Sequence, residues 1–266
     1  MNTVSLKAEP NAAAVGTWAI KVPVVITLVF WLIKMMATTV GETGADYLMQ
    51  NLNFGLLVTT GVMSLALVGM LWAQFSAKRY VPWRYWLTVV LVSVVGTLLT
   101  DNLTDHLGVP LWLSTLGFSL ALIAAFALWY AVERTLSIHS IATPRREAFY
   151  WATILLTFAL GTAAGDWFAE SVGLGFAWSA VAFGGAIAVI TVGYFRFHWN
   201  AVLSFWLAYI LTRPFGASMG DLLSQPVADG GLGLGTTVTS LGFLAAIILL
   251  VAYLTISRRD APRAGD

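Results

Sequence analysis

Residues 30–50 read FWLIKMMATTVGETGADYLMQ, and the same pattern returns at residues 85–105, 150–170 and 205–225. In each copy an aromatic–Trp pair is followed, ten residues after the Trp, by Gly. Asp follows five residues later, and Asp, Glu or Gln four residues after that. The copies start 55, 65 and 55 residues apart, and six of the 13 acidic residues fall in this register. Fixed internal spacing of this kind predicts an array built from one duplicated unit.

The composition predicts that these repeats lie in a lipid bilayer. The chain is 59% hydrophobic and 10% charged, with a mean hydropathy of +0.81, whereas a soluble domain carries about 25% charged residues. The formal net charge of +1 argues against nucleic acid as a partner, and the absence of Cys excludes disulfides and thiolate metal sites. The first 17 residues are polar and Ala-rich, so we expect no signal peptide.

Each repeat contains two apolar segments of roughly 20 residues, the length that crosses a bilayer. We therefore expect an all-α, polytopic membrane protein whose eight transmembrane helices form four parallel two-helix repeats. The expected helices are 18–45, 54–76, 84–105, 110–133, 147–170, 174–196, 200–225 and 234–257. The expected organisation is a tail at 1–17, repeats one and two at 18–133, a basic loop at 134–146, repeats three and four at 147–257, and a tail at 258–266.

Lysine and arginine predict the orientation of this array. Apart from Lys34 and Arg213, they lie before or in the first turn of the first expected helix, around the loops that follow even-numbered helices, or after the last helix: Lys7, Lys21, Lys78, Arg79, Arg84, Arg134, Arg145, Arg146, Arg196, Arg258, Arg259 and Arg263. The alternate loops contain none. The positive-inside rule therefore predicts that both termini are cytoplasmic and that all four repeats share one orientation.

The first half of the motif suggests anchoring and packing roles. The Trp residues near the start of each odd-numbered helix are expected to be interfacial anchors: Trp31, Trp86, Trp151 and Trp206. The Gly residues are each followed at i+4 by a small residue, in the pairs Gly41–Ala45, Gly96–Thr100, Gly161–Gly165 and Gly216–Gly220. Small residues at this spacing let helix backbones approach closely.

The second half of the motif suggests a cation site. The Asp and the residue four positions later share one helical face, in the pairs Asp46–Gln50, Asp101–Asp105, Asp166–Glu170 and Asp221–Gln225. Hard oxygen ligands suit Mg²⁺, Mn²⁺ or Ca²⁺. We expect the four acids of the middle repeats to form the main site, and Asp46, Asp221, Gln50 and Gln225 to complete it. Glu42 and His106 are further candidates, although His106 also fits an ordinary surface residue.

Lys34 and Arg213 are the only expected intramembrane cations. We expect them to pair with the carboxylates, which are costly in hydrocarbon unless they are paired, protonated, hydrated or bound to a cation. Lys34 lies three residues after Trp31, so its amine could also reach the interface. The carboxylates have an alternative reading as water-facing helix ends, but four copies in register favour a shared site.

The motif resembles a family of bacterial membrane proteins known as a repeat of unknown function. The resemblance rests on the four Trp residues with the Gly-x4-Asp that follows each, and it covers about residues 20 to 257. It implies a four-repeat integral protein of the bacterial inner membrane, and it implies no activity.

We expect the protein to be a cation transporter and not an enzyme. The expected substrate is a divalent metal ion of the Mn²⁺ or Mg²⁺ type, with protons as a candidate coupled ion, and no cofactor is expected. Its expected partners are the bilayer, the cation and, as an option, further copies of the chain. Two alternatives remain open at this point: an intramembrane aspartyl enzyme, and a non-transporting membrane scaffold that assembles through the Gly residues.

Overall fold

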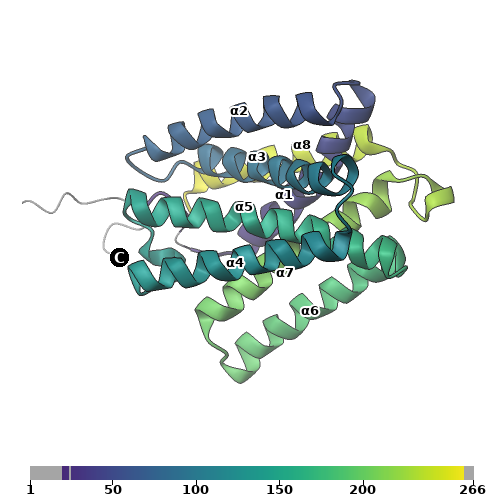
Figure 1. The fold of residues 1–266 in the computed structure, drawn as a ribbon. Coiled ribbons are helices and arrows are strands. Elements are labelled where there is room, and N and C mark those ends of the chain that lie inside the picture. Colours follow the sequence, from purple (N-terminus) through teal and green to yellow (C-terminus); the bar gives the residue numbers. More distant parts are fainter. Residues whose placement is uncertain (1–19, 24, 261–266) are drawn as a thin grey trace, which may run out of the picture.

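The computed structural model describes residues 20–23 and 25–260, and this part of the chain contains helices and no strand. Three short π-helical segments extend three of the long helices: η1 (Tyr47–Asn51), η2 (Asn102–His106) and η4 (Trp167–Ser171). The eight long helices are α1 (Leu28–Asp46), α2 (Leu56–Phe75), α3 (Pro82–Asp101), α4 (Leu111–Glu133), α5 (Pro144–Asp166), α6 (Gly175–Phe197), α7 (Ala201–Ser224) and α8 (Thr236–Ser257), which run side by side (Figure 1).

Six of these helices are long and apolar enough to cross a membrane: α2, α3, α4, α5, α6 and α8. The chain is therefore a membrane protein by length and composition of its helices. The helices α1 and α7 are not among the six. Their buried side chains include four charged groups, Lys34 and Glu42 in α1 and Arg213 and Asp221 in α7.

The prediction that the first helix begins at residue 18 is wrong for the described residues, because α1 begins at Leu28. The Thr27 hydroxyl accepts a hydrogen bond from the backbone N–H of Phe30, which caps the helix there. Before it, the Lys21 amine donates to the Phe75 carbonyl at 2.7 Å and to the Glu147 carboxylate at 3.1 Å. The expected tail at 1–17 lies outside the described residues, as do residues 261–266 of the expected tail at 258–266.

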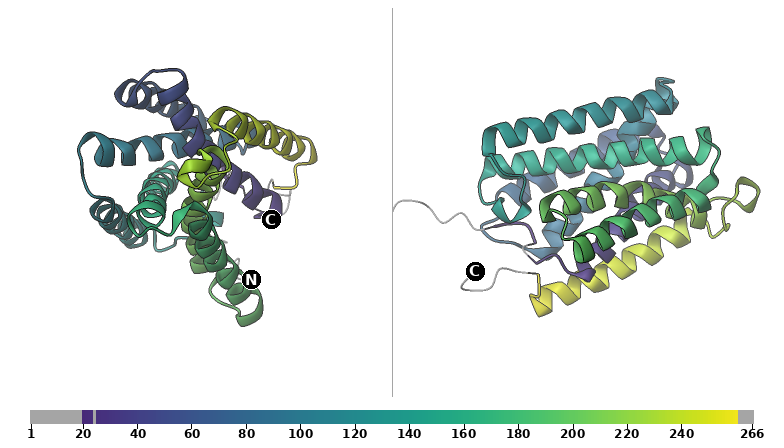
Figure 2. Two further views of the ribbon diagram at one scale, coloured as in Figure 1. Left: turned by 90° about the vertical axis from the view of Figure 1, so that its right-hand side faces the viewer. Right: turned by 90° about the horizontal axis from the view of Figure 1, so that it is seen from below.

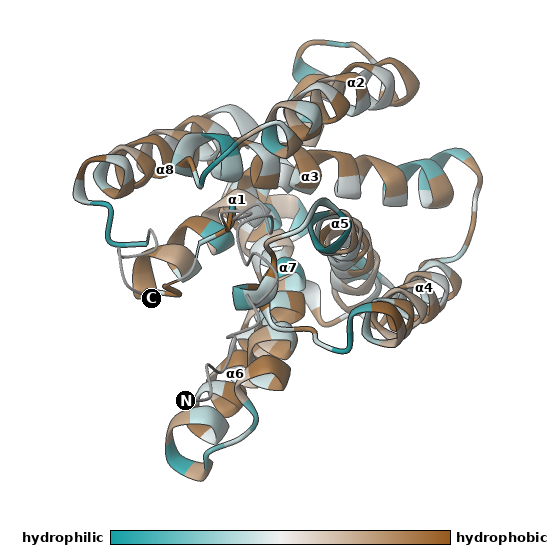
Figure 3. Ribbon diagram, turned by 90° about the vertical axis from the view of Figure 1, so that its left-hand side faces the viewer, coloured by the Kyte–Doolittle hydropathy of each residue, from teal (hydrophilic) through white to brown (hydrophobic). Residues whose placement is uncertain are grey.

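The odd-numbered helices form an inner ring. The helix α1 contacts α3, α3 contacts α5, α5 contacts α7, and α7 contacts α1. Seen along the bundle, these four helices occupy the centre and the even-numbered helices radiate outside them (Figures 2 and 3). The outer helices present apolar side chains such as Leu65, Trp72 and Ile248, each more than 60% exposed, as expected for a surface that faces lipid.

Each outer helix packs against the inner helix of the following repeat. The helix α2 packs on α3, α4 on α5, α6 on α7, and α8 returns to α1. Within the described residues, the first three repeats have little direct contact between their own two helices. The four repeats therefore close into a ring in which every unit covers its neighbour.

The Gly residues of the motif lie at close approaches between inner helices. Each Gly faces the side chain three positions before the Gly of the next repeat: Gly41 faces Ser93, Gly96 faces Phe158, Gly161 faces Arg213, and Gly216 faces Thr38. Close packing at the motif Gly residues, expected from the sequence, is thus present in all four repeats. Because equivalent positions meet each time, the inner helices run parallel to one another.

The aromatic–Trp pairs form a second layer of equivalent contacts at one end of the bundle, which we call the aromatic end. The first aromatic of each pair contacts the Trp of the next repeat: Phe30 with Trp86, Tyr85 with Trp151, Tyr150 with Trp206, and Phe205 with Trp31, at centroid distances of 5.3, 5.6, 6.3 and 5.7 Å. The Trp86, Trp151 and Trp206 side chains are at most 4% exposed. Their expected role as interfacial anchors is wrong, because neighbouring helices cover these rings.

Candidate functional site: a carboxylate cluster at the opposite end

The motif Asp residues lie at the opposite end of the inner ring, which we call the acidic end. Asp46, Asp101 and Asp166 are the last residues of α1, α3 and α5, and each is followed directly by a π-helical segment. Asp221 lies within α7, three residues before its end. Single π-helical turns inside helices occur frequently at functional sites. Three equivalent copies at the same repeat position single out this layer of the bundle.

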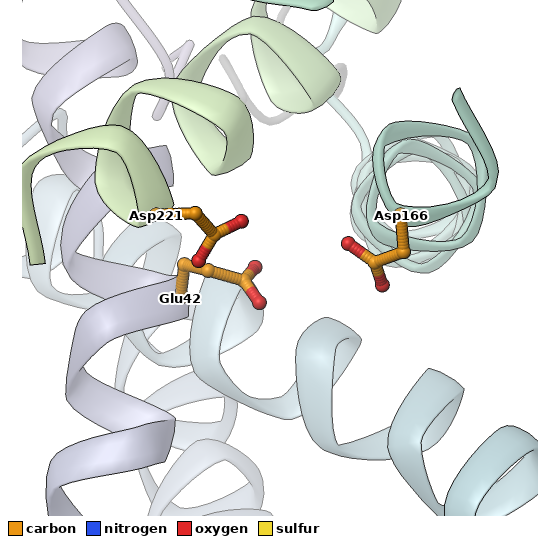
Figure 4. A group of neighbouring side chains, drawn as sticks. All are labelled: Glu42, Asp166 and Asp221. Carbon is orange, nitrogen blue, oxygen red and sulfur yellow. The ribbon is translucent and has the colours of Figure 1, made fainter. Parts of the chain in front are cut away.

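Three carboxylates from three different helices converge there. One oxygen each of Glu42 (α1), Asp166 (α5) and Asp221 (α7) lies within 4.8 Å of the others. The three side chains point toward one another across the inner ring (Figure 4). Glu42 and Asp221 are 8% and 9% exposed, and Asp166 is half-buried.

Glu42 is the common neighbour of the motif Asp residues. Electrostatic repulsion from Glu42 acts on Asp46, Asp101, Asp166 and Asp221 alike. The four equivalent carboxylates therefore surround one additional carboxylate near the axis of the bundle. Like charges this close are unfavourable in a medium of low polarity, so the layer needs protons or cations to be stable.

Arg213 supplies one such cation from the fourth repeat. Its guanidinium is fully buried and donates to the Glu42 carboxylate at 2.8 Å. It also donates to the hydroxyls of Thr97 and Thr162 and to the Thr38 carbonyl. Glu42, Thr97 and Thr162 each directly follow the motif Gly of their own repeat. One arginine thus contacts the same position in all three other repeats.

Lys34 lies deeper, toward the aromatic end, and is also fully buried. Its amine has no hydrogen-bond partner among the described residues and lies over the rings of Phe158 and Tyr209, at 4.1 and 4.3 Å from their centroids. These contacts are cation–π interactions. Lys34 forms no ion pair in the described part of the chain, so the expected pairing with a carboxylate is absent in this conformation.

The expected main site of Asp101, Asp105, Asp166 and Glu170 is not the group that the structure brings together most tightly. Only Asp166 of these four belongs to the three-carboxylate cluster. Asp105 and Glu170 are exposed on π-helical segments, as is His106, and Asp101 is half-buried. Of the outer repeats, Asp46 and Gln225 are half-buried, and the side chain of Gln50 lies outside the described part.

From the sequence, Glu42 was only a further candidate for the cation site, because it is the only acid at its repeat position. Thr97, Thr162 and Ala217 occupy the equivalent places, so the register does not identify it. The available signal was its position four residues before Asp46, on the same helical face.

The cluster offers only oxygen donors. Carboxylates without His or Cys suit a hard cation such as Mg²⁺, Mn²⁺ or Ca²⁺. Within the described residues, no hydrogen bond or ion pair engages the carboxylates of Asp166 and Asp221. These two groups are therefore available to a ligand, whereas Glu42 already has Arg213.

These features define a helical membrane protein built from four equivalent two-helix units around a charged axis. The chain belongs to the family described as Repeat of Unknown Function (DUF347), whose model matches four times, at residues 29–80, 84–135, 149–199 and 204–260. The four matches coincide with the four repeats, which confirms the resemblance drawn from the motif. Comparisons with curated proteins and with solved structures find no match.

Proposed function

We propose that this protein is a transporter of a cation across the bacterial inner membrane, with all eight helices crossing the bilayer and both termini in the cytoplasm. The observation that carries the proposal is the cluster of Glu42, Asp166 and Asp221, whose oxygens lie within 4.8 Å of one another inside a ring of helices. Carboxylates inside membrane bundles are rare and mark ion pathways and proton relays.

The inward orientation of polar side chains supports eight crossings. Lys34 of α1 and Arg213 of α7 are both fully buried against other helices. A helix whose polar face is covered by protein can cross a bilayer with a lower mean hydropathy than one that faces lipid. The helices α1 and α7 also lie in the same inner ring as α3 and α5, which qualify as spans.

The charge balance of the cluster favours a divalent cation. Arg213 forms an ion pair with Glu42 at 2.8 Å, whereas no ion pair among the described residues engages Asp166 or Asp221. A divalent ion would balance these two charges. Protons are the competing ligands because carboxylates must be deprotonated to bind a metal, which couples metal binding to proton release.

The residues between the carboxylate cluster and the aromatic end favour a transporter that alternates between conformations, and they argue against an open channel. Below the cluster, the axis contains Arg213 and Lys34, both fully buried. The contacting aromatic–Trp pairs lie beyond them at the aromatic end. A cation moving straight along this axis would meet the buried Arg213 guanidinium, the buried Lys34 amine and then packed rings, so we expect transport to require that the inner helices rearrange.

The packing of the motif Gly residues argues against the scaffold alternative. That alternative required the motif Gly residues to be available for assembly with other chains. Gly41, Gly96, Gly161 and Gly216 are all covered by neighbouring helices of the same chain. No specific observation favours an aspartyl enzyme.

The test is the uptake of Mn²⁺ into proteoliposomes, together with calorimetric titration of Mn²⁺ into the purified protein. We expect Asp166→Asn and Asp221→Asn to reduce both binding and uptake by at least tenfold. Asp105→Asn is the matched control, because Asp105 is an exposed acid at the same end of the bundle. Binding heats that are equal in wild type and Asp166→Asn would remove the proposed cation site.

A further inference from the structure

A second feature, remote from the carboxylate cluster, lies on the outer surface between α3 and α8. It is an apolar groove of about 500 Å³ near the aromatic end. Its walls include Trp83, Leu87 and Val90 of α3 and Ile248, Ala252 and Ile256 of α8. The volume lies within the range of about 300–1,000 Å³ typical of small-molecule sites.

The groove has the length of one leaflet of a bilayer. Its lining on α8 runs from Leu244 to Ile256, which corresponds to about 18 Å of helix at 1.5 Å per residue. Half of a hydrocarbon core of about 30 Å is about 15 Å. A single acyl chain of a lipid in the leaflet at the aromatic end would therefore lie along the whole groove.

Arginines follow the lining residues on both walls at the aromatic end of the groove, where we expect the headgroup region. Arg84 follows the lining residue Trp83 directly, and its guanidinium lies 5.4 Å from the Trp83 ring centroid. On the other wall, Arg258 and Arg259 follow Ile256 within three residues, and the Arg259 guanidinium lies 5.7 Å from the Tyr253 ring centroid. Both walls thus end in a cation beside an aromatic ring.

These arginines carry no compensating charge within the described residues. The ion pairs at this end of the bundle engage other cations, namely Lys21 with Glu147, and Arg145 and Arg146 with Glu133. The acid nearest in sequence to Arg259 is Asp260, and it is 1% exposed and accepts a hydrogen bond from the Tyr80 hydroxyl at 2.5 Å. The Arg84 Nε atom is buried without a hydrogen-bond partner.

We propose that this groove binds one acyl chain of an anionic phospholipid, whose phosphate is held between Arg84 and Arg259. The apolar walls select a hydrocarbon chain, and the uncompensated arginines select a negatively charged headgroup over a zwitterionic one. Arginine suits this role because its planar guanidinium matches the geometry of phosphate oxygens.

The test is native mass spectrometry and thermal stability of the full-length protein with dioleoyl phosphatidylglycerol and with dioleoyl phosphatidylcholine. The wild type should retain one phosphatidylglycerol and bind it more tightly than phosphatidylcholine. Attraction of an anionic surface to each arginine corresponds to about fivefold in affinity. Arg84→Gln with Arg259→Gln should therefore weaken phosphatidylglycerol binding on the order of 25-fold and abolish the preference. Arg134→Gln, which removes an exposed arginine at the same end, should change neither.

The groove itself is tested by filling it. Ala252→Trp places a large side chain in the groove from an exposed position, so it should abolish lipid retention without disturbing the core. Ala245→Trp is the matched control, an exposed alanine on α8 outside the groove. Equal retention of the two lipids by the wild type would overturn the proposal. Phosphatidylglycerol binding by Ala252→Trp at the wild-type level would also overturn it, as would a groove occupied by a second copy of the chain.

Discussion

The close approach of α3 and α5 at Gly96 makes a single added methyl group informative. A Cβ atom on Gly96 would lie 2.6 Å from the Phe158 Cβ and 3.2 Å from the backbone nitrogen of Ala159. Carbon atoms in favourable contact are about 3.5–4.0 Å apart, so Gly96→Ala must separate the two helices by roughly 1 Å. One turn further on, the Thr100 hydroxyl donates to the Ala159 carbonyl at 2.9 Å, and the same movement would break that hydrogen bond.

The expected cost of Gly96→Ala is about 1–3 kcal/mol, the usual range for overpacking a core. This is the opposite of the effect of helix propensity, which favours Ala over Gly by about 1 kcal/mol. The apparent melting temperature in detergent should fall by roughly 5 °C, since each kcal/mol corresponds to about 2–4 °C for a chain near this size. Gly117→Ala is the control, because an added Cβ there meets nothing within 4 Å. A melting temperature for Gly96→Ala at or above that of Gly117→Ala would refute the close-packing argument.

Three further changes test the charged layer and the loop at the aromatic end. Arg213→Met should destabilise the protein by about 3–5 kcal/mol, because it leaves Glu42 buried without its partner, and Mn²⁺ should stabilise this variant more than it stabilises wild type. Arg196→Met, which removes an exposed arginine, is the control. A melting temperature of Arg213→Met equal to that of wild type would contradict the buried ion pair. Mn²⁺ affinity measured by calorimetry should rise between pH 5 and 7.5, because protons leave the carboxylates. Asp166→Asn should weaken Mn²⁺ binding more than Asp46→Asn, because Asp46 lies outside the three-carboxylate cluster. Binding heats that do not depend on pH would count against a carboxylate site. Burial raises the pKa of Asp260, and the hydrogen bond from Tyr80 opposes this effect. The contribution of Asp260 to stability should therefore be largest below its ordinary pKa of about 3.8 and should decline as pH rises through the raised value. Melting temperatures of Asp260→Asn measured across this pH range should lack the decline, and identical pH profiles for wild type and Asp260→Asn would refute the prediction.

The motif register predicted close helix contacts at the Gly residues, although it did not predict which helices would meet there. The positions of Gly, small residue and Asp recur at exact intervals, so the Gly residues were expected to mark close approaches, and they face equivalent side chains in every repeat. The parallel arrangement followed from the same periodicity and from the even number of helices in each repeat. These features depend on spacing alone, which a sequence displays directly.

The centre of the site depends on the positions where the repeats differ, which periodicity does not reveal. Glu42 and Arg213 each occur once at their repeat position, and they meet only because the ring closes between α7 and α1. The aromatic–Trp pairs were misread for a related reason. A Trp at the end of an apolar helix fits the lipid interface equally well, and only the neighbouring helix decides whether the ring is covered.

The packing of each outer helix on the next repeat has a consequence for biosynthesis. The helix α1 leaves the ribosome before α8, but α8 is the helix that covers the outer side of α1. Until α8 arrives, this side of α1 must rest against lipid or against the membrane insertion machinery. The ring can close only after the whole chain has been inserted, so a chain cut after α4 would be left with one uncovered inner helix and one unpaired outer helix. Two such half-length chains would each offer the outer helix that the other lacks, so exchange of outer helices would cover both.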